Sequence, residues 1–246
     1  MITSNQILAL IKSSSDSKPS VRLNNYISTR ERLNNYIDIN KPDKNTVKAL
    51  VNALMSGEFP EYSTIHFEGI IKPFCMNYLL EALQSGKFPK GLKFSFYRVN
   101  EEVAKFLARV LMSGKCPKNF RIEIFRTNNW WYMEYLADAL ISGKCPEGLG
   151  ITFKRFSLGS APIKPLVDAL YSGMCPENLS ISVEWCYEPS VVDLLAPVSS
   201  GQCPDGLELY LSGNELRSFP GLENILLYRS NKCPKRVVYP SFCKFI

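Results

Sequence analysis

The sequence contains one histidine, His66, in 246 residues, and its eight cysteines include no C-x-x-C pair. Histidine is the side chain most often used as a general base and as a metal ligand, and paired cysteines mark many zinc sites. The phosphate-binding, dinucleotide-binding, zinc-protease and nucleophile-elbow patterns GxxxxGK[ST], GxGxxG, HExxH and GxSxG are also missing. These absences predict a protein that is not an enzyme and that has no metal site and no cofactor.

Long hydrophobic runs are missing as well. The apolar stretch near the N-terminus covers only residues 7–11, so we expect neither a Sec signal peptide nor a membrane-spanning segment. Without such a signal, eight cysteines indicate free thiols in a reducing compartment. The 29 Lys and Arg residues exceed the 23 Asp and Glu residues by only six charges, which argues against a dedicated nucleic-acid-binding protein.

An internal repeat organises the chain. In front of each copy of a five-residue motif, apolar residues recur three and four positions apart, as in VKALVNALM (47–55), which is typical of one buried helix face. The Gly of the motif suits the left-handed residue that ends a helix, and the Pro blocks continuation. The motif reads SGEFP ending at Pro60, SGKFP at Pro89, SGKCP at Pro117 and Pro146, SGMCP at Pro176, SGQCP at Pro204 and SNKCP at Pro234, a spacing of 28 to 30 residues.

Apolar and polar residues alternate after each motif, which predicts a strand with one buried face. The alternating segments are LKFSF (92–96), FRIEI (120–124), LGITF (149–153), LSISV (179–183) and LELYL (207–211). A strand and a helix repeated every 28 to 30 residues predict an α/β fold, a right-handed βα solenoid with parallel strands. We assign residues 1–42 to an irregular N-terminal cap with a first degenerate repeat, and 43–246 to repeats with a C-terminal cap, all in one continuous solenoid domain.

The segment LELYLSGNEL matches the L-x-L-x-L-x-x-N core of a leucine-rich repeat, with Asn214 at the final position. The chain therefore resembles the ribonuclease-inhibitor-like class of leucine-rich repeat proteins, and its LxxAL.SGKCPxGLxIxL pattern is similar to repeats of Legionella-type secreted effectors. The asparagine ladder is largely missing, although Asn100 and Asn128 are candidate substitutes after a shift of one residue. The other copies carry Ile70, Val99, Thr127, Phe156 and Cys186 at the position of Asn214.

The resemblance implies a horseshoe with strands on the concave face and helices on the convex face. It also implies a non-catalytic scaffold, a virulence effector delivered by a Dot/Icm type IV system, that binds a host protein through its concave surface. The effector would reside in the bacterial cytoplasm before secretion and in the host cytosol afterwards. We expect a monomer with no cofactor.

Five cysteines occupy one equivalent position of the repeat, where earlier copies carry Phe59 and Phe88. Phenylalanine binds no metal and attacks no carbonyl, so the shared requirement is packing. Cys186 lies four strands from His66, about 20 Å at ordinary strand spacing, which excludes a dyad; Cys75, which begins the helix after the His66 strand, is the remaining candidate nucleophile. The five equivalent cysteines are Cys116, Cys145, Cys175, Cys203 and Cys233.

Along each predicted strand, every second side chain points away from the core. Together these side chains define a candidate binding surface, which we call the wall. Three arginines at the position after each strand form a basic stripe beside two aromatic residues, a composition that binding hot spots favour. The predicted partner is a host protein with an acidic surface. The predicted partner-binding residues are Lys93, Tyr97, Arg98, Arg121, Phe125, Arg126, Lys154, Arg155, Trp185 and Tyr210.

Alternatives to this interpretation of the wall stay open. The arginines could be solvated and without a partner, or the wall could bind nucleic acid, with arginines on phosphates and aromatic rings on bases. The glutamates Glu68, Glu123, Glu184 and Glu208 on the same wall argue against nucleic acid. A further candidate contact is the pair Trp130 and Trp131, one of which could be exposed.

Overall fold

The structure is a computed structural model that describes residues 5–6, 21–23, 36–39, 43–68, 71–97, 99–125, 132–155, 163–184, 193–212 and 236–238. Its strands are β1 (Val21–Leu23), β2 (Tyr36–Ile39), β3 (Thr64–Phe67), β4 (Lys93–Tyr97), β5 (Arg121–Phe125), β6 (Gly150–Lys154), β7 (Ser180–Glu184), β8 (Glu208–Ser212) and β9 (Arg236–Val238). Its helices are α2 (Lys44–Met55), α3 (Pro73–Gln84), α4 (Glu101–Met112), α5 (Tyr132–Ile141), α6 (Lys164–Tyr171) and α7 (Ala196–Ser199).

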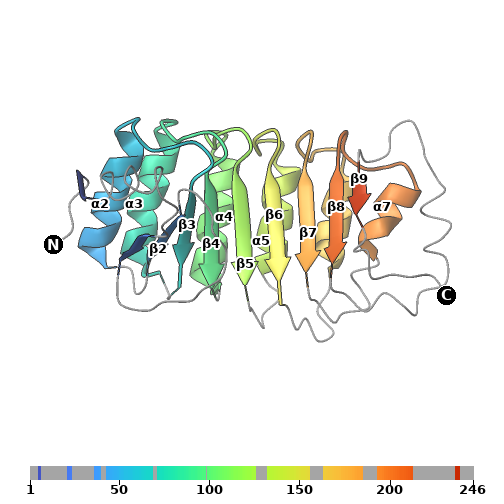
Figure 1. Cartoon of the computed structure of the whole chain (residues 1–246). Coiled ribbons are helices and arrows are strands. Elements are labelled where there is room, and N and C mark those ends of the chain that lie inside the picture. The colour runs from blue at the N-terminus through green and yellow to red at the C-terminus, as the bar shows by residue number, and fades with distance from the viewer. Residues whose placement is uncertain are drawn as a thin grey trace.

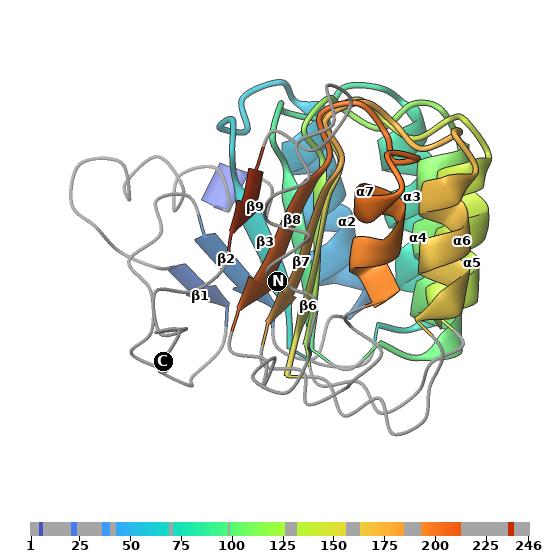
Figure 2. The ribbon, with the colours of Figure 1, turned by 90° about the vertical axis from the view of Figure 1, so that its right-hand side faces the viewer.

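The strands form one sheet whose order follows the chain from β1 to β9, and every neighbouring pair is parallel. Figure 1 shows the strands side by side in front of the helices. In the end-on view of Figure 2 the helices cover one face of the sheet, and no helix of the described residues covers the other, which we call the open face. The prediction of an α/β fold in which parallel strands alternate with helices is confirmed. The strands β1 and β2 fall in the segment predicted as an irregular cap with a first degenerate repeat, and they continue the same sheet.

The hydrophobic core lies between the sheet and the helices. Phe94 and Phe96 of β4 are buried, and the ring of Phe67 stacks on Phe96 with centroids 5.3 Å apart. The predicted strands start one residue before the observed ones, at Leu92 and its equivalents. Leu92 is fully buried and continues the alternation of apolar and polar residues. Its carbonyl accepts from the N–H of Arg121, the first residue of the next strand, at 2.9 Å, so Leu92 bonds to the neighbouring repeat although β4 begins one residue later.

The five-residue motif ends each helix, as the sequence predicts. Gly114 has a φ of +68° directly after the C-cap residue Ser113. The serine has a role that the sequence analysis did not assign. Its hydroxyl donates to the carbonyl of Val110 at 2.7 Å and accepts from the N–H of Lys115 at 3.2 Å. The hydroxyl adds to the bond that the N–H of Ser113 already donates to the same carbonyl at 3.2 Å, and so reinforces the end of the helix.

A second left-handed residue stands two positions before each strand from β3 to β8. The N–H of Asn119 donates to the carbonyl of Glu147 at 3.0 Å, and that of Gly148 donates to Glu177 at 3.0 Å, so the turns of neighbouring repeats are hydrogen-bonded in a ladder. The side chain of Asn119 fills the place that a Cβ on Gly148 would need. Larger residues and glycines therefore alternate along the ladder, which consists of Tyr62, Gly91, Asn119, Gly148, Asn178 and Gly206.

Asn100 does not replace the missing asparagine ladder. Its Oδ1 accepts from the N–H of Val103 at 3.0 Å, so it caps the N-terminus of α4. Val99, at the position where the repeat pattern has asparagine, is buried in the core. Asn128, the other proposed substitute, lies outside the described residues.

Candidate interaction face

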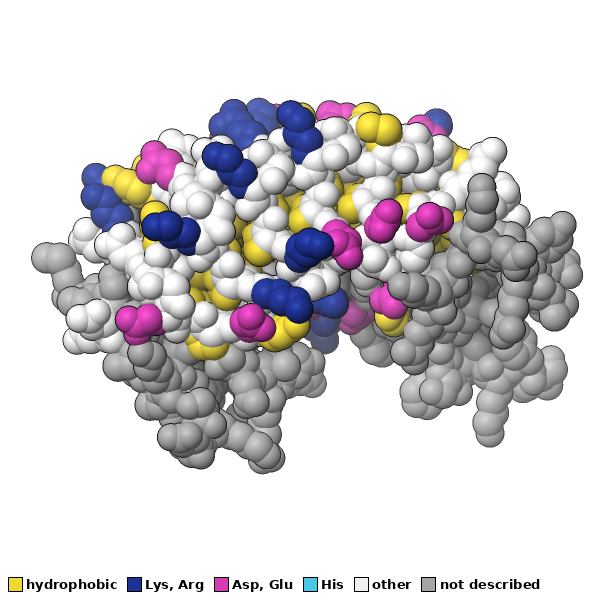
Figure 3. Space-filling view, turned by 90° about the horizontal axis from the view of Figure 1, so that it is seen from above, with side chains coloured by type: hydrophobic (Ala, Val, Ile, Leu, Met, Phe, Trp, Pro, Cys, Tyr) yellow, Lys and Arg dark blue, Asp and Glu magenta, His cyan; other side chains and the backbone are white. Residues whose placement is uncertain are grey.

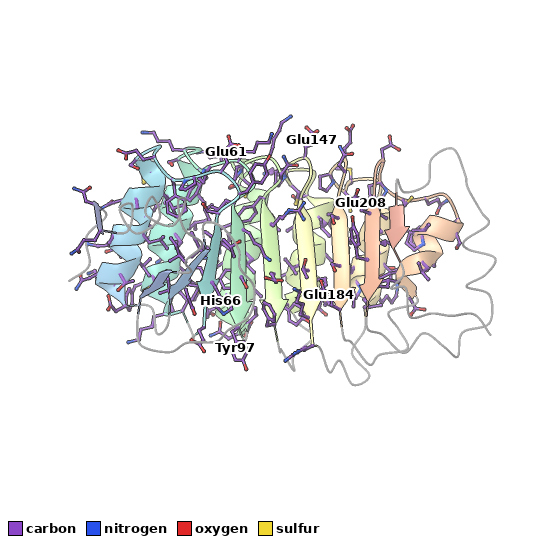
Figure 4. The ribbon with its side chains drawn as sticks, in the orientation of Figure 1. Glu61, His66, Tyr97, Glu147, Glu184 and Glu208 are labelled. Carbon is purple, nitrogen blue, oxygen red and sulfur yellow. The ribbon has the colours of Figure 1, made fainter. Side chains whose placement is uncertain are left out.

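The open face carries the side chains that alternate with the core residues of β3 to β8. Neighbouring strands are in register, so Lys93 of β4 lies opposite Arg121 of β5, and Tyr97 lies opposite Phe125. Figure 4 labels His66, Tyr97 and Glu184 toward the lower ends of these strands. Side chains on one face of adjacent strands are close enough to contact one another directly, so this face is a continuous surface.

A chain of ion pairs crosses the open face from β4 to β7. Glu123 lies at its centre and is only 5% exposed. One of its oxygens is 2.7 Å from Nζ of Lys93, and the other is 2.8 Å from Nζ of Lys154. Lys154 also lies 3.4 Å from a carboxylate oxygen of Glu184. Two lysines and two glutamates on four successive strands therefore neutralise one another.

Glu123 and Lys154 stay charged at neutral pH. Burial raises the pKa of the Glu123 carboxyl, but the adjacent Lys93 and Lys154 ammonium groups lower it by more, and the net pKa lies below the usual value. Burial lowers the pKa of Lys154, and Glu123 and Glu184 more than offset this effect, so the pKa of Lys154 is raised. A carboxylate held between two ammonium groups has no proton to give or take near pH 7, so Glu123 serves to fix the lysines.

His66 lies beside this chain. Its Nδ1 is 2.8 Å from the hydroxyl oxygen of Ser95, and its ring meets the ring of Phe125 edge to face with centroids 6.0 Å apart. Burial lowers the pKa of His66, although Glu123 and Glu68 act in the opposite direction, so the imidazole is neutral at pH 7. The neutral ring therefore contacts a hydroxyl and an aromatic ring.

The cysteine that could have joined His66 in a dyad lies on the other side of the sheet. Cys75 is fully buried on α3, among the core residues, whereas His66 is on the open face. Burial raises the pKa of the Cys75 thiol, which disfavours the thiolate. Cys186 lies outside the described residues.

The predicted partner-binding residues fall into three groups. Lys93 and Lys154 belong to the ion-pair chain, and the hydroxyl of Tyr210 donates to Glu208 at 3.0 Å. Tyr97 and Phe125 are half-buried neighbours, and Arg121 and Arg155 are exposed. Arg98, Arg126 and Trp185, and also Trp130 and Trp131, lie outside the described residues.

Arg121 is the exposed cation at the centre of the open face. Its side chain lies across Gly150 of β6, where a Cβ would be 3.2 Å from Cγ of the arginine. No described carboxylate pairs with it within 4.0 Å, in contrast to Lys93 and Lys154. Sequence reasoning grouped the three cations together because they face the same way. Glu123, which faces the same side of the sheet at the next outward-facing position along the strands, is the sequence feature that indicates that Lys93 and Lys154 are neutralised.

Three cysteines of the repeat motif reinforce the helix ends. Cys116 donates to the carbonyl of Val110 at 3.2 Å, the same carbonyl that Ser113 bonds. Cys145 and Cys175 bond their own helices in the same way at 3.3 and 3.2 Å. Burial raises the pKa of each of these three thiols to about 12. Within the described part of the chain, no three His, Cys, Asp or Glu side chains gather as metal ligands would.

We expect Cys116, Cys145 and Cys175 to resist alkylation in the folded protein. With a pKa of about 12, only about one thiol in ten thousand is ionised at pH 8, and the thiolate is the reactive form. Iodoacetamide treatment followed by peptide mass spectrometry should find these three residues unmodified in buffer and fully modified in urea. Modification in buffer at the rate seen in urea would contradict the packing role.

Nine parallel strands in chain order, backed by helices on one face, define a repeating parallel α/β protein. Comparisons with protein-family models, with curated proteins and with solved structures find no match for this chain. No helix among the described residues has the length and apolar character needed to cross a membrane.

Proposed function

We propose that the protein is a leucine-rich repeat protein of the ribonuclease-inhibitor-like class that binds another protein through its open face and catalyses no reaction. In this proposal the repeats wind as a right-handed solenoid and the open face is concave. The strand order and the one-sided placement of the helices support the repeat class. The Legionella-like repeat pattern supports an effector role, with delivery by a type IV system into the host cytosol and action there as a monomer.

The observation that carries binding is the partly exposed aromatic pair Tyr97 and Phe125 at one end of the open face, with the exposed Arg121 at the other end of β5. Tyr97 and Phe125 are neighbours in register, both partly exposed, and Arg121 begins the same strand as Phe125. Aromatic and arginine side chains dominate the energetics of protein interfaces. Lys154, which Glu123 and Glu184 hold in place, lies over the Phe125 ring with its Nζ 5.4 Å from the ring centre, so this contact helps to fix the orientation of the ring.

The charges on the open face favour a protein partner over nucleic acid. Lys93 and Lys154 are already bound to Glu123, so they are not available to release counterions from phosphates. Arg121 and Arg155 would contact acidic groups of the partner. Toward β7 and β8 the face carries Glu184 and Glu208, which would repel a phosphate backbone and suit basic side chains of a protein.

We expect Arg121→Glu and Phe125→Ala each to weaken binding of the partner by about tenfold or more, since truncation of a hot-spot residue costs roughly 2 kcal/mol. The partner is captured from host-cell lysate on the immobilised chain, identified, purified, and titrated by calorimetry. Lys72→Glu and Phe74→Ala are the matched controls, because both residues are exposed on the helix side. They should leave the affinity unchanged.

Two results would contradict the proposal. One is capture that Arg121→Glu and Phe125→Ala leave intact while the folded state is unchanged. The other is tight RNA or DNA binding with a steep salt dependence, which would assign the open face to nucleic acid.

A further inference from the structure

The exposed large apolar side chains gather at one edge of the protein. Seven such side chains are exposed among the described residues, and all but Phe74 lie where a helix ends or in the turns that follow it. Single exposed apolar residues are ordinary, but a row of them indicates an interaction site. The six are Met55, Tyr62, Met112, Ile141, Tyr171 and Met174, with exposed fractions from 37% to 59%.

The same edge carries a block of lysines. Three successive helix-to-strand loops supply them at two repeat positions, after the Gly and after the Pro of the motif, and every one is exposed. Figure 3 looks down on this edge and shows Lys and Arg side chains interleaved with hydrophobic ones. Lys118 pairs with Glu147 at 2.6 Å, and no described carboxylate lies within ion-pair distance of the other four. We call these residues the lysine edge: Lys87, Lys90, Lys115, Lys118 and Lys144.

Acidic residues occupy the equivalent positions of the loops on both sides of the lysine edge. Glu58 and Glu61 come before it and Glu177 and Asp205 come after it, while Glu147 lies in the last lysine loop itself, after Lys144. Because either sign of charge fits these positions of the fold, the repeat geometry does not require lysine in the middle loops. The lysine edge therefore covers only three loops, and this length limits the size of the partner segment that it can bind.

Apolar side chains directly adjoin the lysines. The ring of Tyr62 lies against Gly91, next to Lys90, in the place that a Cβ on that glycine would need. At the other end, Cε of Met174 is 3.0 Å from the place of a Cβ on Gly143, next to Lys144. Met112 and Ile141 end the helices that lead into two of the lysine loops. The surface is therefore cationic and apolar at once.

We propose that the lysine edge binds a short acidic segment of another protein, one that combines several Asp or Glu residues with an aromatic or aliphatic side chain. Successive loops are spaced by about 5 Å on the strand side and about 9 Å on the helix side. Three loops thus span roughly 10 to 20 Å, the reach of about three to six extended residues. An anionic membrane fits less well, because a flat surface would meet these five carboxylates together with the five lysines.

The test starts from a displayed library of random dodecapeptides selected on the full chain near physiological salt. We expect the selected peptides to be rich in Asp and Glu, with at least one Phe, Tyr, Trp or Leu. Calorimetry with the most enriched peptide should then show that Lys87→Glu combined with Lys115→Glu weakens binding by about tenfold or more, since opposed charges at an interface are strongly unfavourable.

Matched variants separate this edge from the rest of the surface. Lys44→Glu combined with Lys72→Glu changes the net charge by the same amount at exposed sites elsewhere and should leave binding within about twofold. Tyr62→Asn should reduce affinity for peptides with an apolar residue without unfolding the chain, since Asn119 and Asn178 occupy the equivalent position. Circular dichroism melts verify that each variant is folded.

Three outcomes would overturn the proposal. The first is a selection without acidic peptides. The second is peptide binding that the Lys87→Glu and Lys115→Glu pair leaves intact, including the case in which Arg121→Glu abolishes it and so assigns the peptide to the open face. The third is co-sedimentation of the chain with phosphatidylserine vesicles that this same pair removes, which would assign the edge to a membrane surface.

Discussion

Replacing Glu123 with alanine is expected to lower the free energy of unfolding by about 3 kcal/mol, because removal of one partner from a buried ion pair leaves an uncompensated charge behind. Here two charges are affected, since Glu123 holds both Lys93 and Lys154 at 2.7 and 2.8 Å. The lysines are 25% and 22% exposed and can turn partly toward water, so the loss falls at the lower end of the usual range for buried pairs. Urea unfolding followed by circular dichroism measures it.

Two further variants identify the cause of this loss. Glu208→Ala removes a partly exposed carboxylate that accepts a hydrogen bond from the hydroxyl of Tyr210, and it should cost less than about 1 kcal/mol. The triple variant Lys93→Met, Glu123→Leu, Lys154→Met replaces the charges with apolar groups and should be more stable than Glu123→Ala alone. A Glu123→Ala protein within about 0.5 kcal/mol of the original would refute a stabilising ion-pair chain.

The contribution of Glu123 should also depend on pH. The pKa of its carboxyl is lowered in the folded state from a usual value of 4.5, so the unfolded chain takes up the proton first as the pH falls. The stabilisation is therefore fully present above pH 4.5 and is lost as the pH falls from there through the folded pKa. The difference in unfolding free energy between the original protein and Glu123→Gln should be constant near neutral pH and shrink in acid.

The repeat geometry was largely accessible from the sequence because it depends on local rules. Gly114 and Pro117 mark a helix end wherever they occur together, and the alternation around Phe94 identifies a strand. These rules involve residues close together in the chain, so they hold without knowledge of the rest of the fold.

The interactions that fix the open face could not be read from the sequence. The columns of side chains follow from strand register, but whether Lys93 points at Glu123 or at solvent depends on rotamers and burial across strands. The same limit explains the cysteines. Comparison with Phe88 indicated packing, whereas the shared bond of Ser113 and Cys116 to one carbonyl needs the loop in three dimensions.

Replacing Gly148 with alanine should lower the free energy of unfolding by about 2 to 4 kcal/mol, the sum of a left-handed backbone and a steric overlap. The φ of Gly148 is +72°, and the new methyl group would meet Oδ1 and Cγ of Asn119. Gly114→Ala is the matched control. It has nearly the same φ of +68° but no atom within 4 Å of its Cβ position, so it should cost only the backbone part, about 1 to 2 kcal/mol. Chemical denaturation of both variants measures the difference.

Asn119→Gly combined with Gly148→Ala tests the cause of the overlap. Asn119 itself has a φ of +59°, which glycine adopts readily, and its N–H bond to Glu147 involves only the backbone. Without the asparagine side chain the methyl group has room, so the double variant should recover about 1 to 2 kcal/mol relative to the sum of the single changes, as expected for residues in contact. Additive effects would mean that the turn ladder accepts two side chains in successive repeats, and that the alternation of glycine with larger residues has another cause.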